Sequence, residues 1–365
     1  MSNKEKPPRI RLSIEEYELI QGIREQAVEH KIGIKHVPMG WMKGAKSSFM
    51  FKNPMYKPEL EESEGIDFNS IIKTIVASPF DRHEREKNIA LLSGFFDRLV
   101  YTDVHIGMEV NPNGAGLYGG VWNKDEVLRR RDLMANHVLD TQESGILYID
   151  ELGDFVDGWN GQTVRKGHDL PQNMTNQEAY DVAVEFKVGL LQQLAPYFKK
   201  IYCRNICKDN HSGDFGYVVN SAVKRISEMM FPSKVSVYNQ LKFIEHYIVG
   251  NKFAFVTTHG KDDINLKTGF KPHLKPQDRE KIDVYMIQNN LMRNSLDFEV
   301  EFSKGDTHIY LFDSSTSLHF NYYNYPAFSP PSDWVQTNFK PTRSGFVSFN
   351  YRDGKDKSIN EYMFR

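Results

Sequence analysis

The feature that most constrains the fold is an alternation of strand-like and helix-like segments that begins near residue 95. Short apolar runs, which are typical of buried strands, occupy residues 99–102, 146–149 and 200–203. Segments with apolar residues at helical spacing follow these runs, at 124–139, after a Thr175–Glu178 capping box, and at 217–230. Because strands that alternate with helices form layered sheets, this part of the chain predicts an α/β fold.

The pattern then changes to one made mostly of strands. Strand-like runs occur at 235–238, 243–249, 253–257, 298–302, 309–312, 318–323 and 345–351. A helix is expected at 277–291, and Gly250-Asn251 is a hairpin turn signal between two of the strands. This order predicts two sheets packed together, with helices on the outside.

The first part of the chain differs in composition, and we divide the sequence into an accessory segment, 1–94, and a main domain, 95–365. A helix is expected after Ser13, which forms a capping-box pattern with Glu16. The stretch GWMKGAKSSFMFKNP predicts a hairpin or an extended arm, and NPMYKPELEESEG reads as a linker. The segment is either a helical cap on the main domain, which we favour, or an arm that binds DNA or a partner.

Composition excludes several classes of protein. Hydrophobic residues make up 40% of the 365 residues and charged residues 26%, which is typical of a globular chain. There is no apolar run long enough for a membrane helix and no signal-like start, so we expect a cytoplasmic protein without a membrane partner. A net charge of −2 excludes a uniformly basic surface, and two cysteines are too few for a disulfide scaffold.

Residues that bind metals or transfer protons follow five of the predicted strands. They are Asp103 and His105, Asp154 and Asp157, Asn210 and His211, His259, and Asp306 and His308. Strand ends in layered α/β folds meet at one edge, where sites form. Imidazole, carboxylate and amide ligands suit Mn, Fe or Zn better than Ca. The five strand ends together predict a metal site.

The order D-x-H, G-D-x-x-D, N-H, H-G, G-x-x-H, over roughly residues 95–325, resembles the calcineurin-like metallophosphoesterases. The likeness is closest to the branch of DNA-repair exonucleases and its phage-encoded members. It implies a four-layer α/β/β/α fold: a two-sheet β-sandwich flanked by helices, here with an N-terminal helical extension. The sequence departs from the family pattern at three positions, Asp209, Ser212 and Asp306.

The resemblance also implies a role for each strand-end residue. Asp103, His105 and His308 would hold a first divalent metal ion, Asn210 and His259 with Asp306 would hold a second, and Asp154 would bridge the two. His211 would be the catalytic residue that acts on the phosphate. Mn is the metal expected, with Fe, Zn and Mg as alternatives.

The residues that would choose the substrate lie in the segments between these motifs. Arg165, His168 and Arg204 are candidates for phosphate contacts, and Trp122 and Trp159 for stacking on bases. The leading interpretation is a two-metal phosphodiesterase that cleaves DNA. The alternatives are a phosphoesterase for a small nucleotide or phosphoprotein, and a metal-poor relative that only binds. DNA and a second copy of the chain are the partners considered.

Overall fold

The computed structural model describes residues 95–110, 120–165, 167–250, 252–260, 272–292, 299–332, 335, 343–352 and 357–364, and the backbone of 39–43 and 48–52. The chain divides into two compact units, Met1–Ser70 and Ile71–Arg365. In the first unit, β1 (Met39–Lys43) and β2 (Ser48–Lys52) pair antiparallel, which is the hairpin alternative expected there. The predicted first helix, the predicted linker and the boundary after residue 94 lie outside the described residues.

The first sheet of the second unit has six strands in the order β13-β12-β3-β4-β5-β6. Four of these strands pair in parallel: β3 (Phe96–Tyr101), β4 (Ile146–Glu151), β5 (Lys200–Ile206) and β6 (Val235–Gln240). Two antiparallel strands extend the sheet beyond β3: β12 (Gly345–Tyr351) and β13 (Lys357–Met363). The sheet is therefore mixed, with its parallel part where the sequence alternates strand and helix.

The second sheet has five strands in the order β10-β11-β9-β8-β7. Its strands are β7 (Ile244–Val249), β8 (Phe253–Thr258), β9 (Glu299–Lys304), β10 (Leu311–Asp313) and β11 (Asn321–Asn324). Strands β8 and β9 are parallel, while β7 and β8 form an antiparallel hairpin. The turn of that hairpin includes Gly250 with φ of +59°, a left-handed conformation that favours glycine.

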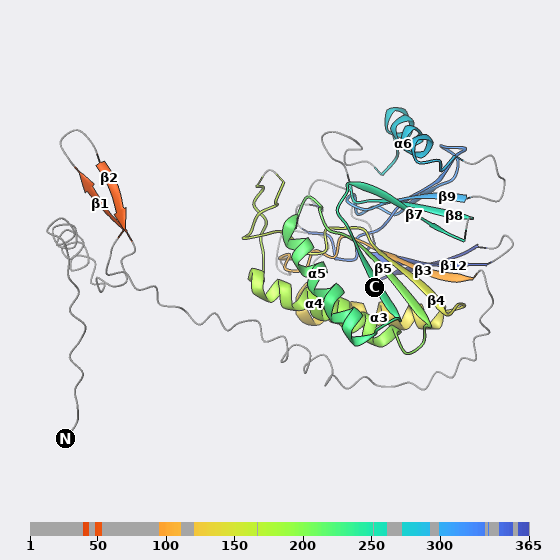
Figure 1. Cartoon of the computed structure of the whole chain (residues 1–365), viewed down its shortest axis with the longest axis horizontal. Coiled ribbons are helices and arrows are strands. Elements are labelled where there is room, and N and C mark those ends of the chain that lie inside the picture. The colour runs from red at the N-terminus through yellow and green to blue at the C-terminus, as the bar shows by residue number, and fades with distance from the viewer. Residues whose placement is uncertain are drawn as a thin grey trace, which may run out of the picture. The chain divides into compact units, whose positions relative to one another are not determined.

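Helices cover the outer faces of both sheets (Figure 1). Three helices pack on the first sheet, α3 (Lys124–Asp140), α4 (Asn176–Leu194) and α5 (Asp214–Met230), and α6 (Pro276–Gln288) packs on the second. Three separate apolar cores result: one under the three helices, one between the sheets, and one under α6. The second unit is thus an α/β fold in which two mixed sheets pack face to face between helices.

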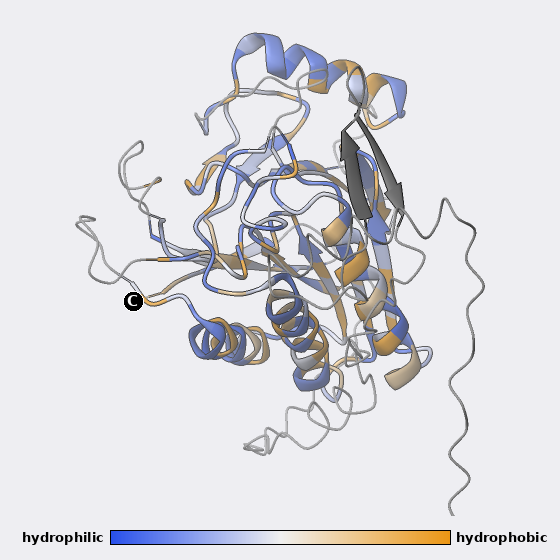
Figure 2. Cartoon of the chain, turned by 90° about the vertical axis from the view of Figure 1, so that its left-hand side faces the viewer, coloured by the Kyte–Doolittle hydropathy of each residue, from blue (hydrophilic) through white to orange (hydrophobic). Residues whose placement is uncertain are grey.

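Local sequence explains where the helices begin and which side of them is buried. The predicted capping box of α4 is present, with Thr175 and Glu178 each bonded to the other's backbone. Helix α3 begins after Asn123, whose side chain accepts from the N–H of Glu126. Figure 2 shows hydrophilic and hydrophobic residues on different sides of the helices, as expected when one side packs on a sheet.

Some predicted boundaries were wrong. Helix α5 begins at Asp214 rather than at 217, α6 ends at Gln288 rather than at 291, and strands β10 and β11 are displaced toward the C-terminus by one to three residues. Strand β13 was not predicted, because its residues are mostly half-buried and carry no apolar run.

The layer between the two sheets contains a buried ion cluster. Arg98 on β3, which is fully buried, contacts Asp150 on β4 at 2.6 Å and Glu301 on β9 at 3.0 Å. Its guanidinium also donates to Ser303 and lies 4.2 Å from the centre of the Phe255 ring. The cluster therefore joins β3 and β4 of the first sheet to β9 of the second, three strands whose ends carry site residues.

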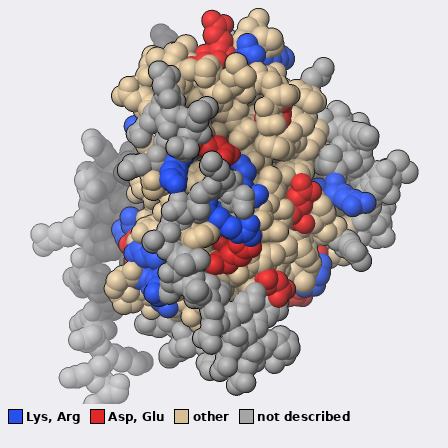
Figure 3. Space-filling model, turned by 90° about the vertical axis from the view of Figure 1, so that its right-hand side faces the viewer, with Lys and Arg blue, Asp and Glu red and all other residues tan. Residues whose placement is uncertain are grey.

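On the face shown in Figure 3, Lys and Arg are interspersed with Asp and Glu rather than gathered in one basic area. Within the described residues, every helix is too short or too polar to cross a lipid bilayer.

Candidate metal centre

The predicted strand-end residues come from two parallel sets of strands. Asp103 and His105 follow β3, Asp154 follows β4 and His211 follows β5, which are neighbours in the first sheet. His259 follows β8, and Asp306 and His308 follow β9, which are neighbours in the second sheet. Because the carboxyl ends of parallel neighbours lie at one edge, each sheet delivers its site residues together.

The backbone at these strand ends is unusual. Eight non-glycine residues among those described have positive φ, and five of them are predicted site residues: Asp103 (54°), His105 (49°), Asp154 (48°), Asp306 (75°) and His308 (57°). Asp and His tolerate this conformation better than most residues, but it still costs about 1 kcal/mol or more each. Such strain concentrated at one place is typical of a functional site.

Three glycines next to the site residues allow the strand ends to approach closely. A Cβ on Gly153, whose φ is +102°, would lie 2.8 Å from the His259 ring. A Cβ on Gly260 would lie 2.6 Å from Cγ of Asp306, and one on Gly305 would lie 2.3 Å from Oγ1 of Thr102. Gly153 and Gly305 therefore allow the ends of the two sheets to approach each other, and Gly260 allows the ends of β8 and β9 to approach within the second sheet.

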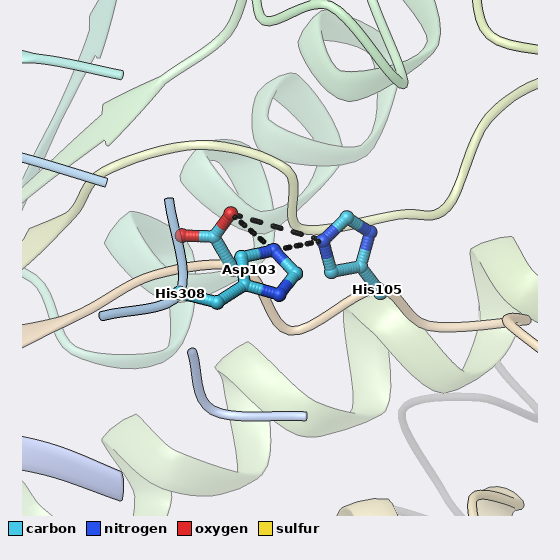
Figure 4. Close-up of side chains that lie close together, drawn as sticks. All are labelled: Asp103, His105 and His308. Carbon is cyan, nitrogen blue, oxygen red and sulfur yellow. Dashed lines mark hydrogen bonds and ion pairs between the residues drawn. The ribbon is translucent and has the colours of Figure 1, made fainter. Parts of the chain in front are cut away.

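One group of possible ligands consists of Asp103, His105 and His308 (Figure 4). Nε2 of His308 lies 3.1 Å from Oδ1 of Asp103 and 3.2 Å from Nε2 of His105. Nε2 of His105 lies 3.7 Å from the same Asp103 oxygen. These three atoms face one another across the two sheets, and they are the set that the resemblance assigns to the first metal.

Two further groups share Asp154. One joins it to Asp103 and His259, and the other joins it to His105 and His211. Oδ2 of Asp154 lies 2.9 Å from Nε2 of His259 and 3.7 Å from Nε2 of His211. Within each of the three groups the ligand atoms lie no more than 4.8 Å apart. Asp103, His105 and Asp154 each belong to two of the three groups found among the described residues, so the groups form one connected cluster.

Hydrogen bonds at the far nitrogen of two histidines orient the rings. Nδ1 of His105 lies 2.8 Å from Oδ1 of Asp157, and Nδ1 of His259 lies 2.6 Å from the carbonyl oxygen of Leu152. A carbonyl only accepts, so Nδ1 of His259 carries the proton and Nε2 is the nitrogen presented to the centre. This arrangement is the usual one for metal-binding histidines, whose second nitrogen donates to a carboxylate or carbonyl.

The charges of the cluster perturb its pKa values strongly. Burial alone would raise the pKa of Asp103, but His308 and His105 outweigh it and hold that pKa well below its usual range. His211 and His259 likewise lower the pKa of Asp154 against the effect of burial. Burial lowers the pKa of His259, but the Asp154 carboxylate raises it to about 10. The cluster therefore stabilises ionised carboxylates next to positive charge.

The residues present fit divalent cations. Nε2 of His259 and Oδ1 of Asp103 are buried and face ionisable groups of the same cluster, at 2.9 Å from Oδ2 of Asp154 and at 3.1 Å from Nε2 of His308. These contacts depend on protons at the imidazoles, and a divalent cation takes the place of such protons. Imidazole nitrogens with carboxylate oxygens suit Mn, Fe or Zn, and a cation there would replace the protons that the imidazoles now hold.

Sequence reasoning missed the part played by Asp209, which it identified only as a departure from the family pattern. Oδ2 of Asp209 accepts from the N–H of Asp154 at 3.0 Å. Oδ1 accepts from the N–H groups of His211 at 3.1 Å and Ser212 at 2.6 Å. Burial, followed by the charge of Asp154, raises the pKa of Asp209 to about 6. One carboxylate therefore connects the turn that carries Asp154 to the loop that carries His211.

The two remaining predicted ligands are placed beside the cluster. Asn210 is half-buried next to His211, and its carbonyl accepts from the N–H of Arg165 at 3.2 Å. Asp306 donates its N–H to Oδ2 of Asp103 at 3.1 Å, and its own Oδ2 is buried without a hydrogen-bond partner among the described residues. Asp306 belongs to none of the three ligand groups found in the described part of the chain.

The predicted substrate contacts have different surroundings. Arg204 lies between the sheets, where its guanidinium is 4.3 Å and 4.5 Å from the ring centres of Tyr238 and Tyr247. His168 is exposed, and Arg165 is half-buried in the loop beside Asn210. Trp122, one of the two candidates for stacking on bases, packs in the core instead, because it is only 2% exposed and its indole N–H donates to the carbonyl of His105.

Comparison with known proteins gives only distant likenesses. No protein-family model matches the sequence, and no curated protein does. One solved structure is 8% identical with a TM-score of 0.36, over 73% of this chain and 98% of the other. Another is a Staphylococcus aureus protein provisionally described as a 5′-nucleotidase, in complex with alpha-ketoglutarate. It is 12% identical with a TM-score of 0.29, over 73% of this chain and about half (53%) of its own. Likenesses this distant do not identify a family.

Proposed function

We propose that this chain is a metal-dependent phosphodiester hydrolase that cleaves DNA. The observation that carries the proposal is the meeting of two carboxylates and four imidazoles, from five separate strand ends, in one buried cluster. Left-handed backbone at most of these residues supports it, because a merely structural cluster would not require such strain. We further propose that the protein acts in the cytoplasm.

The cluster assigns roles to its residues. Asp103, His105 and His308 would hold one divalent cation, His259 would hold a second with help from Asn210, and Asp154 would be a ligand shared by the two. Bound cations of this kind polarise a phosphoryl oxygen and neutralise charge that develops on the phosphate. We propose Mn²⁺ for both positions, because the ligands are nitrogen and oxygen atoms without thiolates.

His211 has the position of a residue that acts on the substrate. Its Nδ1 lies 3.4 Å from Oδ1 of Asp157, which orients the ring, and its side chain is 19% exposed where that of Asp154 is 2% exposed. It therefore reaches from the cluster toward solvent. A protonated imidazole there would stabilise negative charge on the phosphate and give its proton to the leaving oxygen.

The proposal is tested by incubating the purified full chain with Mn²⁺ and four substrates: single-stranded DNA, duplex DNA, a bis-aryl phosphodiester and an aryl phosphomonoester. Cleavage of DNA is expected, with the bis-aryl diester cleaved more slowly. Asp154→Asn, purified in the same way, is the control for contaminating nucleases and should be inactive.

Other outcomes would overturn parts of the proposal. Cleavage of small esters without DNA would favour a phosphoesterase for small nucleotides or phosphoproteins. Failure to cleave any substrate, with Mn²⁺, Fe²⁺, Zn²⁺ and Mg²⁺ each tried, would favour a protein that only binds.

A further inference from the structure

Among the described residues of the cluster, two imidazoles are the most exposed. The side chains of Asp103, His105, Asp154 and His259 are at most 4% exposed, whereas those of His211 and His308 are 19% and 15% exposed. We call this part of the cluster its open side, because a substrate phosphate can reach these two imidazoles. Residues that border His211 are in a position to contact whatever is attached to that phosphate.

The loop formed by residues 158–165 and 167–170 lies directly against His211. The N–H of Val164 donates to the carbonyl of His211 at 3.1 Å, and the N–H of Arg165 donates to the carbonyl of Asn210. A Cβ on Gly213 would lie 2.7 Å from Cγ1 of Val164, so the valine packs on the chain just after His211. The loop thus forms the border of the open side next to His211.

This loop has an internal hydrogen-bonded structure. The backbones of Trp159 and Gln162 bond to each other in both directions, at 3.0 and 3.1 Å, and the N–H of Leu170 donates to the carbonyl of Gly161. Gly158 has φ of +131°, and a Cβ there would lie 2.5 Å from the carbonyl oxygen of Gln162. The loop therefore presents its side chains in defined positions rather than as a free tail.

Trp159 leaves much of its indole in solvent. It is 46% exposed, and the nearby Val164 is 52% exposed. The indole contacts the Phe215 ring edge-on, with centroids 4.8 Å apart, and Phe215 follows His211 by four residues. By contrast, Trp122 is buried in the core. An ordered loop that holds an indole exposed next to the open side of a phosphate site is suited to stacking on an aromatic ring of the substrate.

The polar residues of the same loop suit a charged chain. Arg165 and His168 both belong to it, and His168 is exposed. An exposed aromatic ring and a cationic arginine on one loop are the combination that binds a base and the backbone of a single strand, although the same loop also carries the exposed Asp169. A base in a duplex is covered by its neighbours, whereas an unpaired base offers a free face to the indole.

We propose that Trp159 stacks on an unpaired nucleobase next to the scissile phosphate, so that the substrate is single-stranded nucleic acid. The inference rests on the proposed phosphodiesterase function and specifies its substrate. Trp159 is a specificity residue here and takes no part in bond cleavage, so its loss should weaken binding of bases, and any effect on an aryl diester should appear in KM rather than in kcat.

The test compares two fluorescent twelve-nucleotide probes, oligothymidylate and the same backbone with every base removed. Fluorescence anisotropy in EDTA, which prevents cleavage, gives Kd for the full-length protein and for Trp159→Ala, Trp159→Phe and Tyr197→Ala. Tyr197 is a matched control, because it is an exposed aromatic residue beyond the C-terminal end of α4. Hydrolysis of bis(p-nitrophenyl) phosphate with Mn²⁺ is measured for the same four proteins.

We expect Trp159→Ala to raise Kd for oligothymidylate by about fivefold or more and to leave Kd for the abasic probe unchanged. Trp159→Phe should retain most of the preference, and Tyr197→Ala all of it. Equal binding of both probes by the unaltered protein, or equal weakening of both by Trp159→Ala, would overturn the inference. Absence of diester hydrolysis with the preference intact would instead overturn the proposed hydrolase and leave the stacking site standing.

Discussion

Replacing Asp209 by Asn should separate stability from activity. The carboxylate of Asp209 accepts N–H groups from both Asp154 and His211, through different oxygens. An amide keeps one acceptor oxygen, so one of these two connections is lost and an NH₂ group then faces a backbone N–H. The bond to Asp154 is the one we expect to break, because the other oxygen accepts three backbone N–H groups, those of His211, Ser212 and Gly213.

The expected change in stability is small because two effects oppose each other. Losing a hydrogen bond to a charged group costs about 1.5–3 kcal/mol. Against this, the pKa of Asp209 is raised from 3.8 to about 6, so its ionised form is destabilised at neutral pH by roughly 3 kcal/mol, which Asn avoids. The free energy of unfolding should therefore change by about 1 kcal/mol or less. Catalysis should fall by about 100-fold, because Asp154 and His211 lose their common anchor.

The assay measures kcat and KM for bis(p-nitrophenyl) phosphate, together with urea unfolding, for the unaltered protein and Asp209→Asn. Asp214→Asn is the control, because the Asp214 side chain is 89% exposed and its ion pair with Lys208 is long, at 3.7 Å. A fall in kcat with unchanged stability is expected for Asp209→Asn alone. Full activity, or a loss of activity that merely follows a loss of folded protein, would refute the anchoring role.

Three further predictions concern other residues. His211→Ala should keep its metal content, measured by mass spectrometry, and lose about 100-fold or more in kcat; unchanged kcat would remove it from the mechanism. Arg98→Met removes the cation that pairs with buried Asp150, while Glu301 keeps Lys357 at 2.7 Å, so urea unfolding should show a loss of about 3 kcal/mol, and a loss below about 1 kcal/mol would contradict the stabilising role of this buried ion cluster. Burial raises the pKa of Asp97 to about 6, so Asp97 binds a proton more tightly in the folded than in the unfolded state. The stabilisation that this proton gives the folded state is fully present below about pH 4 and is lost as pH rises through about 6. Asp97→Asn should therefore remove a decrease of about 3 kcal/mol between pH 4 and 7, and parallel pH profiles of the two proteins would show that no such shift exists.

The sequence predicts the fold best where burial is complete. Every residue of β3 and β12 is buried, and both strands could be predicted from their apolar residues, although in β3 only the part after Asp97 and Arg98 forms an apolar run. Strand β13 covers the edge of the sheet with half-buried residues, and its pattern is too weak to read without its partner β12. The start of α5 was missed because its first turn follows Gly213, whose φ of +51° belongs to the site loop rather than to a helical pattern.

The candidate site was predictable only in part, because local sequence places residues at strand ends but does not reveal contacts between distant parts of the chain. Asp103, His105 and Asp154 come directly after buried strands, so their position could be inferred from local sequence. The anchoring by Asp209 joins residues 55 positions apart and depends on backbone N–H groups, which leave no trace in residue types. Local patterns cannot separate an exposed from a buried tryptophan either.

The central claim is that the cluster binds two divalent cations. It is tested most directly by growing crystals of the full chain with Mn²⁺ and measuring anomalous scattering above and below the manganese absorption edge. We predict one anomalous peak within ~2.3 Å of Asp103 and His308 and a second at a similar distance from Asp154 and His259. Peaks elsewhere, or none at these residues at saturating Mn²⁺, would contradict it.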